Sequence, residues 1–443
     1  MNSKVRIGLL ITLAVIVVAV VGGYWYVRPL LLTGTGYAAH NACALTHIAG
    51  RDDVDRDLPP NPLVPHLRTE VTDDGATASV RGLLAGQRAW FEPDAGCTLH
   101  SGERGSHGTL TAVPAGPGLP DGPTGPELDA ALNRAFGDDL PADQRQALGT
   151  RAVIVVHDGR IVAERYADGF TADTPQLGWS MSKSVTNLLT GVLVEQGRVA
   201  LDDDHLRPEW NDERAAITVD DLLRMTSGIE WDETYDLGTP ITRMLYLEPD
   251  MAGYVAGLPG AHPPGEYQQY SSGSTNLLCS VLTQRADTSP ADLPRAELFA
   301  PLGLGSAVWE ADGVGTPVCS SYLWATPRDW AAIGQFALQD GVWQDERLLP
   351  EGWMADSTTA HEVPHTEDPG YASGWWVNQL PDESLKNPAL PADAYWASGH
   401  DGQRLYVVPS ADLVVLRLGF SPGVEGADLR TDELLAEVVD TIG

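Results

Sequence analysis

The segment Gly178-Trp179-Ser180-Met181-Ser182-Lys183 places a serine and a lysine three residues apart at the start of a predicted helix. The helix is expected over residues 181–196, because apolar residues recur at positions 185, 188, 189 and 192 and a glycine follows at 197. Residues three apart share a helix face, so the Ser180 hydroxyl and the Lys183 amine are expected to meet. A buried amine that loses its proton activates a hydroxyl. The spacing therefore predicts Ser180 as a nucleophile and Lys183 as its base.

The rarity of lysine supports this interpretation of Lys183. The chain contains only three lysines, Lys4, Lys183 and Lys386. Arginine keeps its proton near neutral pH, whereas a desolvated lysine releases it. A surface lysine on the first turn of a helix would also be disfavoured by the helix dipole. The alternative, a capping serine followed by a surface lysine, accounts for neither observation.

Two later segments contain further candidate residues. In Tyr270-Ser271-Ser272, the phenol of Tyr270 would relay protons beside a lysine, although an isolated tyrosine is more often a half-buried aromatic. In His400-Asp401-Gly402, a glycine at a strand edge allows close approach of a substrate. The next main-chain N–H, that of Gln403, would form an oxyanion hole with the N–H of Ser180.

The chain is expected to divide into four segments. Residues 1–28 form a transmembrane anchor, residues 37–112 a small β-rich module, residues 113–126 a Gly/Pro-rich linker, and residues 127–443 the main domain. Hairpins are predicted at 152–166 and 404–418, near the two ends of the main domain, with mostly helical sequence between them. This pattern predicts an α+β fold, in which an antiparallel sheet is flanked by helices and a mostly helical lobe is inserted.

The first segment predicts the location of the rest of the chain. Residues 7–27 are uncharged and apolar, long enough to span a bilayer, and Lys4 and Arg6 precede them. The positive-inside rule then leaves the N-terminus in the cytoplasm and the main domain in the periplasm or at the cell surface. A cleaved signal peptide is the alternative, and it would make the protein secreted.

The net charge and the cysteines limit which ligands and partners the chain is expected to bind. The chain has 28 Lys and Arg against 61 Asp and Glu, a formal charge of −33, which argues against nucleic acid as a partner.

Export permits disulfides, and Cys43 and Cys97 bracket one segment that they are expected to close. Cys279 and Cys319 either form a second bridge or remain buried thiols. No cysteine spacing resembles a metal site, so no metal is expected.

Taken in order, Ser180-x-x-Lys183, Tyr270-Ser271-Ser272 and His400-Asp401-Gly402 resemble the three motifs of serine β-lactamases and penicillin-binding proteins. The chain is most similar to the class C β-lactamase-related branch, which includes family VIII esterases, D-aminopeptidases and 6-aminohexanoate-dimer hydrolases. The resemblance covers about residues 127–443 and implies a β-lactamase-like fold, no cofactor, and a small amide or ester as substrate.

The resemblance also implies roles for individual residues. Ser180 would form an acyl-enzyme, Lys183 and Tyr270 would share the acid and base roles, and the N–H groups of Ser180 and Gln403 would bind the oxyanion. Substrate contacts would come from Ser272, His400, Gly402, Trp231 and Trp375, with Trp376 as a further wall, although these tryptophans would serve equally as core residues.

Two departures from the β-lactamase motifs bear on the substrate. Ser272 stands where β-lactamases have asparagine, and His400 stands where they have lysine. Both changes favour short esters or amides over β-lactams. The alternatives are a cell-wall DD-peptidase, a β-lactamase, and a non-catalytic penicillin-binding-like sensor.

Overall fold

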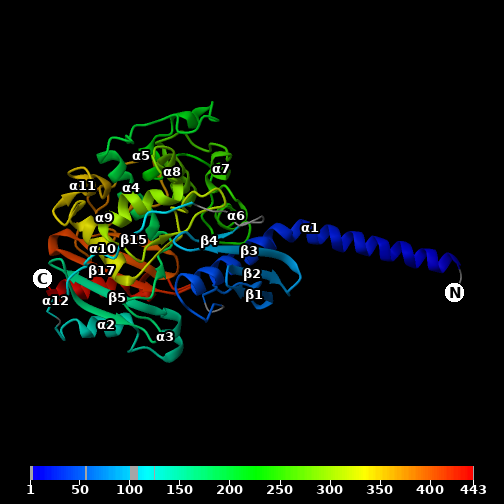
Figure 1. Ribbon diagram of the computed structural model, residues 1–443, viewed down its shortest axis with the longest axis horizontal. Helices are drawn as coiled ribbons and strands as arrows, with labels where there is room; N and C mark the ends of the chain where they lie inside the picture. Colours follow the sequence, from blue (N-terminus) through cyan, green and yellow to red (C-terminus); the bar gives the residue numbers. More distant parts are fainter. Residues whose placement is uncertain (1–2, 55–56, 100–107, 124, 443) are drawn as a thin grey trace.

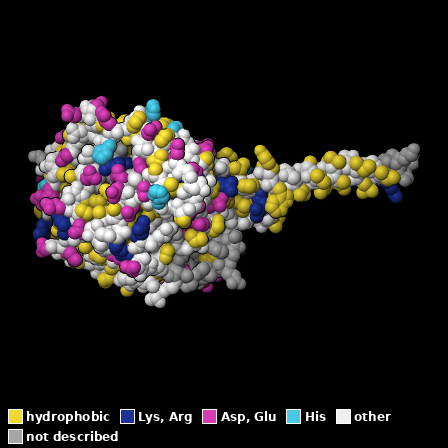
Figure 2. All heavy atoms as spheres, turned by 90° about the horizontal axis from the view of Figure 1, so that it is seen from above, with side chains coloured by type: hydrophobic (Ala, Val, Ile, Leu, Met, Phe, Trp, Pro, Cys, Tyr) yellow, Lys and Arg dark blue, Asp and Glu magenta, His cyan; other side chains and the backbone are white. Residues whose placement is uncertain are grey.

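The computed structural model describes residues 3–54, 57–99, 108–123 and 125–442. A long N-terminal helix projects from a globular body, and a small sheet lies where the two meet (Figure 1). The body carries Asp and Glu side chains across the face seen in Figure 2, whereas the projecting helix is covered by hydrophobic side chains.

The N-terminal helix α1 runs from Ser3 to His47, twenty residues beyond the apolar stretch seen in the sequence. Its outer part is exposed and is long and apolar enough to cross a membrane. Its inner part is rich in small residues that are fully buried: Ala38, Ala39, Ala42, Cys43 and Ala44. Small side chains let the helix lie close against the sheet beside it. The segment expected to be a β-rich module from residue 37 therefore begins with the last three turns of α1.

The small sheet beside α1 has four antiparallel strands in chain order. Its strands are β1 (Leu67–Thr72), β2 (Gly75–Val80), β3 (Leu84–Glu92) and β4 (Gly96–Leu99). A disulfide joins Cys43 of α1 to Cys97 of β4, with the Cα atoms 6.1 Å apart, so the predicted bridge is present. Helix and sheet thus form one covalently closed module.

The main sheet has six strands in the order β14-β15-β16-β17-β5-β6, all pairs antiparallel. The first hairpin supplies β5 (Thr150–His157) and β6 (Arg160–Tyr166). The C-terminal part supplies β14 (Trp376–Val377), β15 (Tyr395–Gly399), β16 (Gln403–Val408) and β17 (Leu413–Gly419). Strands from both ends of the main domain therefore pair, as the sequence pattern predicts.

Helices cover both faces of this sheet. Alternate side chains of β5 point to opposite faces and belong to two separate hydrophobic clusters. Ile154 and Val156 pack with α4 (Met181–Glu195) and α10 (Pro327–Leu338). Val153 and Val155 point the other way, toward α2 (Asp129–Ala135) and α12 (Thr431–Ile442). This layered arrangement is the β-lactamase-like fold expected from the motifs.

The middle of the chain forms the inserted lobe, which is mostly helical. Its helices are α5 (Val219–Leu223), α6 (Pro240–Leu247), α7 (Met251–Ala256), α8 (Ser272–Gln284), α9 (Ala300–Leu302) and α11 (Trp353–Ser357). Short strands edge it: β7 (Gln176–Leu177), β8 (Tyr267–Gln268), β9 (Val308–Trp309), β10 (Leu323–Ala325), β11 (Val342–Trp343), β12 (Glu346–Arg347) and β13 (His365–Thr366). Helix α3 (Ala142–Leu148) precedes β5. The lobe and the main sheet together position the site described next.

Candidate active site

Ser180 lies at the turn that leads from β7 into α4, where it is the N-cap residue. The preceding Trp179 has a φ of 48°, in the left-handed region that residues other than glycine seldom adopt. Strain of this kind persists only where the surrounding structure enforces it, and it concentrates at functional sites. Trp179 is 5% exposed, so packing holds the turn and presents Ser180 at the start of the helix.

Lys183 lies one helical turn after Ser180 and is almost fully buried, at 2% exposure. Its Nζ lies 2.9 Å from Ser180 Oγ, 2.9 Å from Ser272 Oγ and 3.1 Å from the carbonyl oxygen of Ser320. Burial lowers the pKa of Lys183 to about 8, while the negative charge of Glu233 opposes this shift. A substantial fraction of the amine is therefore neutral near pH 8, which is the form able to accept the serine proton.

Glu233 was not predicted from the sequence, yet it is central to the site. It accepts hydrogen bonds from the main-chain N–H of Ser272 at 2.9 Å, from the Ser272 hydroxyl at 2.6 Å and from the indole N–H of Trp231. It also lines the same pocket as Ser180. Glu233 is one of several acids between residues 230 and 236, and nothing in their spacing marks it out.

Tyr270 faces Lys183 from the segment before α8. The centre of its ring lies 4.8 Å from Lys183 Nζ, and the ring stacks on Trp376 at 5.5 Å. Burial and the charge of Glu233 raise the pKa of Tyr270, whereas a hydrogen bond with Ser180 and the charge of Arg404 lower it. The phenol is therefore protonated at neutral pH, which suits a group that donates a proton.

A pocket of about 620 Å³ opens over Ser180. Its walls bring together residues from α4, the lobe and the main sheet: Ser180, Glu233, Tyr235, Tyr270, Trp376, His400, Gly402 and Arg404. The structure thus gathers Ser180, Tyr270, His400 and Gly402, all predicted from the sequence, around one cavity. Tyr235 and Arg404 are additional lining residues.

The end of β15 closes the pocket from the sheet side. A side chain on Gly399 would collide with the carbonyl oxygen of Gly178, so only glycine allows the strand to lie against the nucleophile turn. His400 follows and stacks on Tyr235, with ring centres 4.3 Å apart. Gln403 begins β16 and fixes that strand to its neighbour, because its side chain exchanges hydrogen bonds with the N–H and carbonyl of Gly419.

Three residues predicted to contact substrate do not line this pocket. Ser272 is fully buried and contacts Lys183 and Glu233 instead. Trp375 is fully buried and donates its indole N–H to Asn187, so the prediction was wrong for it, and the adjacent Trp376 is the wall residue. Trp231 is 5% exposed and lies behind Glu233. These predictions failed because residue type alone does not say which face a side chain occupies.

A second disulfide lies behind the site, between Cys279 of α8 and Cys319, with the Cα atoms 5.9 Å apart. Of the two alternatives left by the sequence, the bridge is therefore the one present. Cys319 precedes Ser320, whose carbonyl accepts a hydrogen bond from Lys183. The bridge thus ties a partner of the lysine to the helix that follows Tyr270. Among the described residues, no group of three His, Cys, Asp or Glu side chains is placed to hold a metal ion.

The N-terminal module contacts residues next to Ser180. Tyr37 of α1 lies edge-on to Trp179, with ring centres 6.0 Å apart, and stacks on Tyr246 at 5.0 Å. His40 of α1 lies 3.1 Å from the buried carboxylate of Glu310. The inner part of α1 therefore packs beside the turn that leads to Ser180.

Comparison with known proteins agrees with this architecture. The family model described as Beta-lactamase matches residues 134–439. The chain is 24% identical over 302 residues to the 6-aminohexanoate-dimer hydrolase of Paenarthrobacter ureafaciens, covering 62% of this chain and 73% of that protein.

Solved structures show the same fold. EstCE1, a hydrolase with promiscuous acyltransferase activity, superposes with a TM-score of 0.56 at 17% identity, covering 71% of this chain and 98% of that one. A class C beta-lactamase gives a TM-score of 0.55 at 14% identity, covering 72% and 97%.

Proposed function

Because the chain belongs to the beta-lactamase family of hydrolases, we propose that it is a serine hydrolase that cleaves ester or amide bonds through an acyl-enzyme on Ser180. The observation that carries this proposal is the buried contact of 2.9 Å between Lys183 Nζ and Ser180 Oγ. A hydroxyl next to a buried amine of lowered pKa is an activated nucleophile. The 6-aminohexanoate-dimer hydrolase and EstCE1 support hydrolysis of amides or esters.

In the proposed reaction, neutral Lys183 accepts the Ser180 proton as Oγ attacks the substrate carbonyl. The main-chain N–H groups of Ser180 and Gln403 stabilise the oxyanion, and the positive end of the α4 dipole supports them. Lys183 and Tyr270 then return a proton to the leaving alcohol or amine, and the carbonyl re-forms as the acyl-enzyme. Water attacks the acyl group in the second half, with the same two residues moving the proton.

The charges in the pocket support neutral esters and amides as the main substrates. Glu233 and Arg404 both line it, one negative and one positive, so neither sign of charge dominates. His400 stands where β-lactamases have the lysine ammonium that pairs with the carboxylate of their substrate.

A second candidate substrate carries a carboxylate, as β-lactams and D-alanyl peptides do. Arg404 favours it, because its guanidinium lies in the pocket and can pair with a carboxylate in a forked geometry. Release of D-alanine from a peptidoglycan fragment, or turnover of nitrocefin, would select this candidate.

We also propose that the outer part of α1 anchors the protein in a membrane, with the catalytic domain outside the cytoplasm. The exposed apolar surface of residues 7–27 and the two disulfides support this location. The protein should stay in the membrane fraction after an alkaline wash. Recovery of the full-length chain in the soluble fraction would contradict the anchor, and recovery of a shortened chain would indicate a cleaved signal peptide.

Labelling with a fluorophosphonate probe tests the catalytic proposal. Ser180 should be labelled and p-nitrophenyl acetate hydrolysed, and Ser180→Ala should abolish both. Ser410→Ala is the matched control, because Ser410 is exposed and distant in the fold on the turn between β16 and β17. Labelling without turnover of any ester or amide would favour a non-catalytic sensor instead.

A further inference from the structure

A second cavity, of about 280 Å³, lies next to the catalytic pocket. It is enclosed by α1, by the loop that follows α1 and by the segment that follows Glu233. Its lining includes five aliphatic side chains, Leu58, Leu63, Val64, Leu67 and Leu237, together with the polar side chains of Thr33, Asn61, Asp236 and Thr242. The two cavities share Tyr235 and His400, whose stacked rings form a common wall. A substrate chain that reaches from Ser180 into this cavity therefore has to displace this pair of rings.

The inner end of the cavity is polar. Tyr37 and Tyr235 line it, and their hydroxyl groups are buried and have no hydrogen-bond partner among the residues that the structure describes. Tyr37 also lies edge-on to Trp179, next to the nucleophile. The polar end of the cavity is thus the end nearest Ser180.

The outer end of the cavity lies along α1 toward the projecting part of the helix, because Thr33 and Gly34 line the cavity as well as Tyr37. A side chain on Gly34 of α1 would collide with Leu63, and a side chain on Gly238 would collide with Leu30. Gly34 and Leu30 precede Tyr37 in α1, and an α-helix advances about 1.5 Å along its axis per residue. Both residues therefore lie closer than Tyr37 to the N-terminal end of the helix. This end of the cavity is therefore the one nearer the exposed, membrane-compatible part of the helix.

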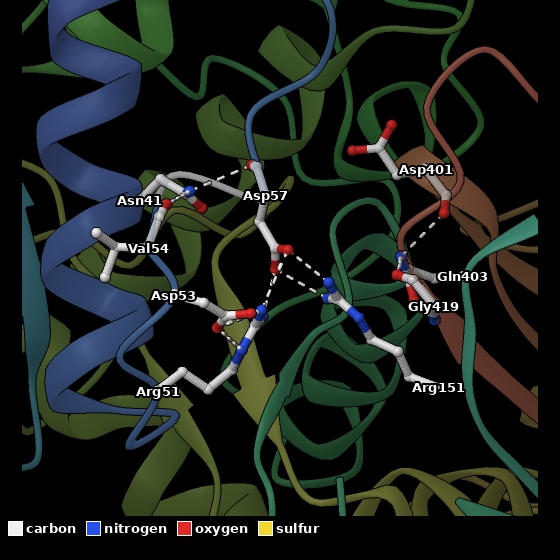
Figure 3. Close-up of polar contacts among 9 residues, drawn as sticks. All are labelled: Asn41, Arg51, Asp53, Val54, Asp57, Arg151, Asp401, Gln403 and Gly419. Carbon is white, nitrogen blue, oxygen red and sulfur yellow. Dashed lines mark hydrogen bonds and ion pairs between the residues drawn. The ribbon is translucent and has the colours of Figure 1, made fainter. Parts of the chain in front are cut away.

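Ion pairs hold the loop that forms one wall of this cavity. Asp57, just before the lining residue Leu58, receives hydrogen bonds from Arg51 and from Arg151 of β5, the latter at 2.8 Å from Nη1 (Figure 3). Asn41 of α1 donates to the Asp57 carbonyl at 3.2 Å. Burial alone would raise the pKa of Asp57, but the two arginines keep it below its usual range. The carboxylate is ionised, and the wall is fixed to both α1 and the main sheet.

We propose that this cavity binds the aliphatic chain of an amphiphilic ester or amide whose reacting carbonyl lies at Ser180. The inference rests on the proposed function, and it extends the substrate class beyond the short esters favoured by the motifs. A water-sized group occupies about 30 Å³, so the cavity accepts a chain of about nine such groups.

A chain-length series of p-nitrophenyl esters, from acetate to decanoate, tests the proposal on the full chain in lipid nanodiscs. Each buried methylene contributes up to about a fourfold gain in binding, so kcat/KM should rise at least about tenfold from butyrate to octanoate. Val64→Trp fills the cavity and should remove this gain while leaving butyrate turnover within about twofold. Val71→Trp is the matched control, because Val71 is exposed on β1.

The possible outcomes test the cavity proposal and the proposed function separately. Butyrate turnover with no gain for longer chains, or an equal gain in Val64→Trp, would overturn the cavity proposal and leave the proposed function intact. Absence of turnover for every ester would overturn the proposed function, and a binding measurement then decides the cavity. For that measurement, Ser180→Ala is photolabelled with a diazirine-bearing twelve-carbon fatty acid and the labelled peptides are mapped.

Label is expected in residues 57–67 and 235–246, and it should fall in Val64→Trp. Label confined to residues 7–27 would overturn the proposal. Two arms distinguish the source of the chain: the probe is supplied either in the same nanodisc as the protein or free in solution. Labelling only in the first arm identifies a membrane lipid as the ligand, and labelling in both identifies a free amphiphile.

Discussion

Glu233 accepts two hydrogen bonds from Ser272, one from its main-chain N–H at 2.9 Å and one from its hydroxyl at 2.6 Å. The same hydroxyl lies 2.9 Å from Lys183 Nζ. Ser272 therefore links a carboxylate to the amine that is proposed to activate Ser180. Ser272, which stands where β-lactamases have asparagine, makes this chain of contacts. Its contacts with Lys183 and Glu233 explain why Ser272 is buried and does not line the pocket.

Replacing Glu233 with glutamine should weaken catalysis and change its pH dependence. A hydrogen bond to a charged group is worth about 1.5–3 kcal/mol, so kcat/KM should fall by about 10-fold to 100-fold. The charge of Glu233 raises the pKa of Lys183, so its removal should move the midpoint of the pH profile to lower pH. Glu230→Gln, at an exposed neighbouring acid, should change neither quantity. A loss of rate without any shift of the midpoint would assign Glu233 a purely structural role.

The wild-type enzyme should become more active as the pH rises through about 8. The neutral form of Lys183 is the proposed base, its pKa is lowered to about 8 by burial, and the fraction of neutral amine increases above that value. The kcat/KM for p-nitrophenyl butyrate, corrected for spontaneous hydrolysis, should reach half its plateau near that pH. A profile that is flat between pH 6 and pH 9 would show that no group of this pKa limits the reaction.

Local patterns predicted much of this structure. The i, i+3 spacing at the start of α4 was sufficient for the contact between Ser180 and Lys183, and alternation and turn residues located β5, β6, β16 and β17 to within about two residues. The extent of α1 was not predicted, because the uncharged apolar stretch ends at Val27 and Arg28 follows it. The helix continues because its small residues pack on the sheet, a tertiary effect.

Glu233 could not have been found in the same way. It lies in a loop 50 residues after Lys183, and only the fold brings the two together. The choice between Trp375 and Trp376 likewise depended on which side of a strand faces the pocket. A shift of one residue moves each side chain to the opposite face of the strand. Strand β14 has only two residues, so its sequence shows no alternation from which the face toward the pocket could be inferred.

Substrate preference should favour esters over β-lactams. His400 supplies no fixed charge, so the kcat/KM for p-nitrophenyl butyrate should exceed that for nitrocefin by at least about tenfold. Residual nitrocefin turnover should depend on Arg404, whose removal in Arg404→Ala should lower it more than it lowers butyrate turnover. Faster hydrolysis of nitrocefin than of the ester would instead support the carboxylate-bearing class of substrates.

The disulfide between Cys279 and Cys319 should support both stability and activity. It closes a loop of 40 residues, for which the loss of chain entropy in the unfolded state predicts about 4 kcal/mol. Changing both cysteines to serine should lower Tm and, because Cys319 precedes the Ser320 carbonyl that holds Lys183, also lower kcat. Differential scanning calorimetry and ester kinetics measure the two effects. An unchanged Tm in the double variant would contradict a structural role for this bridge.

The central claim is that a covalent acyl group forms on Ser180 with Lys183 as its base. Rapid acid quench of the enzyme with p-nitrophenyl butyrate, followed by peptide mass spectrometry, tests it most directly. The account predicts a butyryl group on the peptide that contains Ser180 in the wild type, none in Ser180→Ala, and at least about a hundredfold slower acylation in Lys183→Arg, since arginine cannot give up its proton. Acylation of a different residue, or an equally fast acylation in Lys183→Arg, would contradict it.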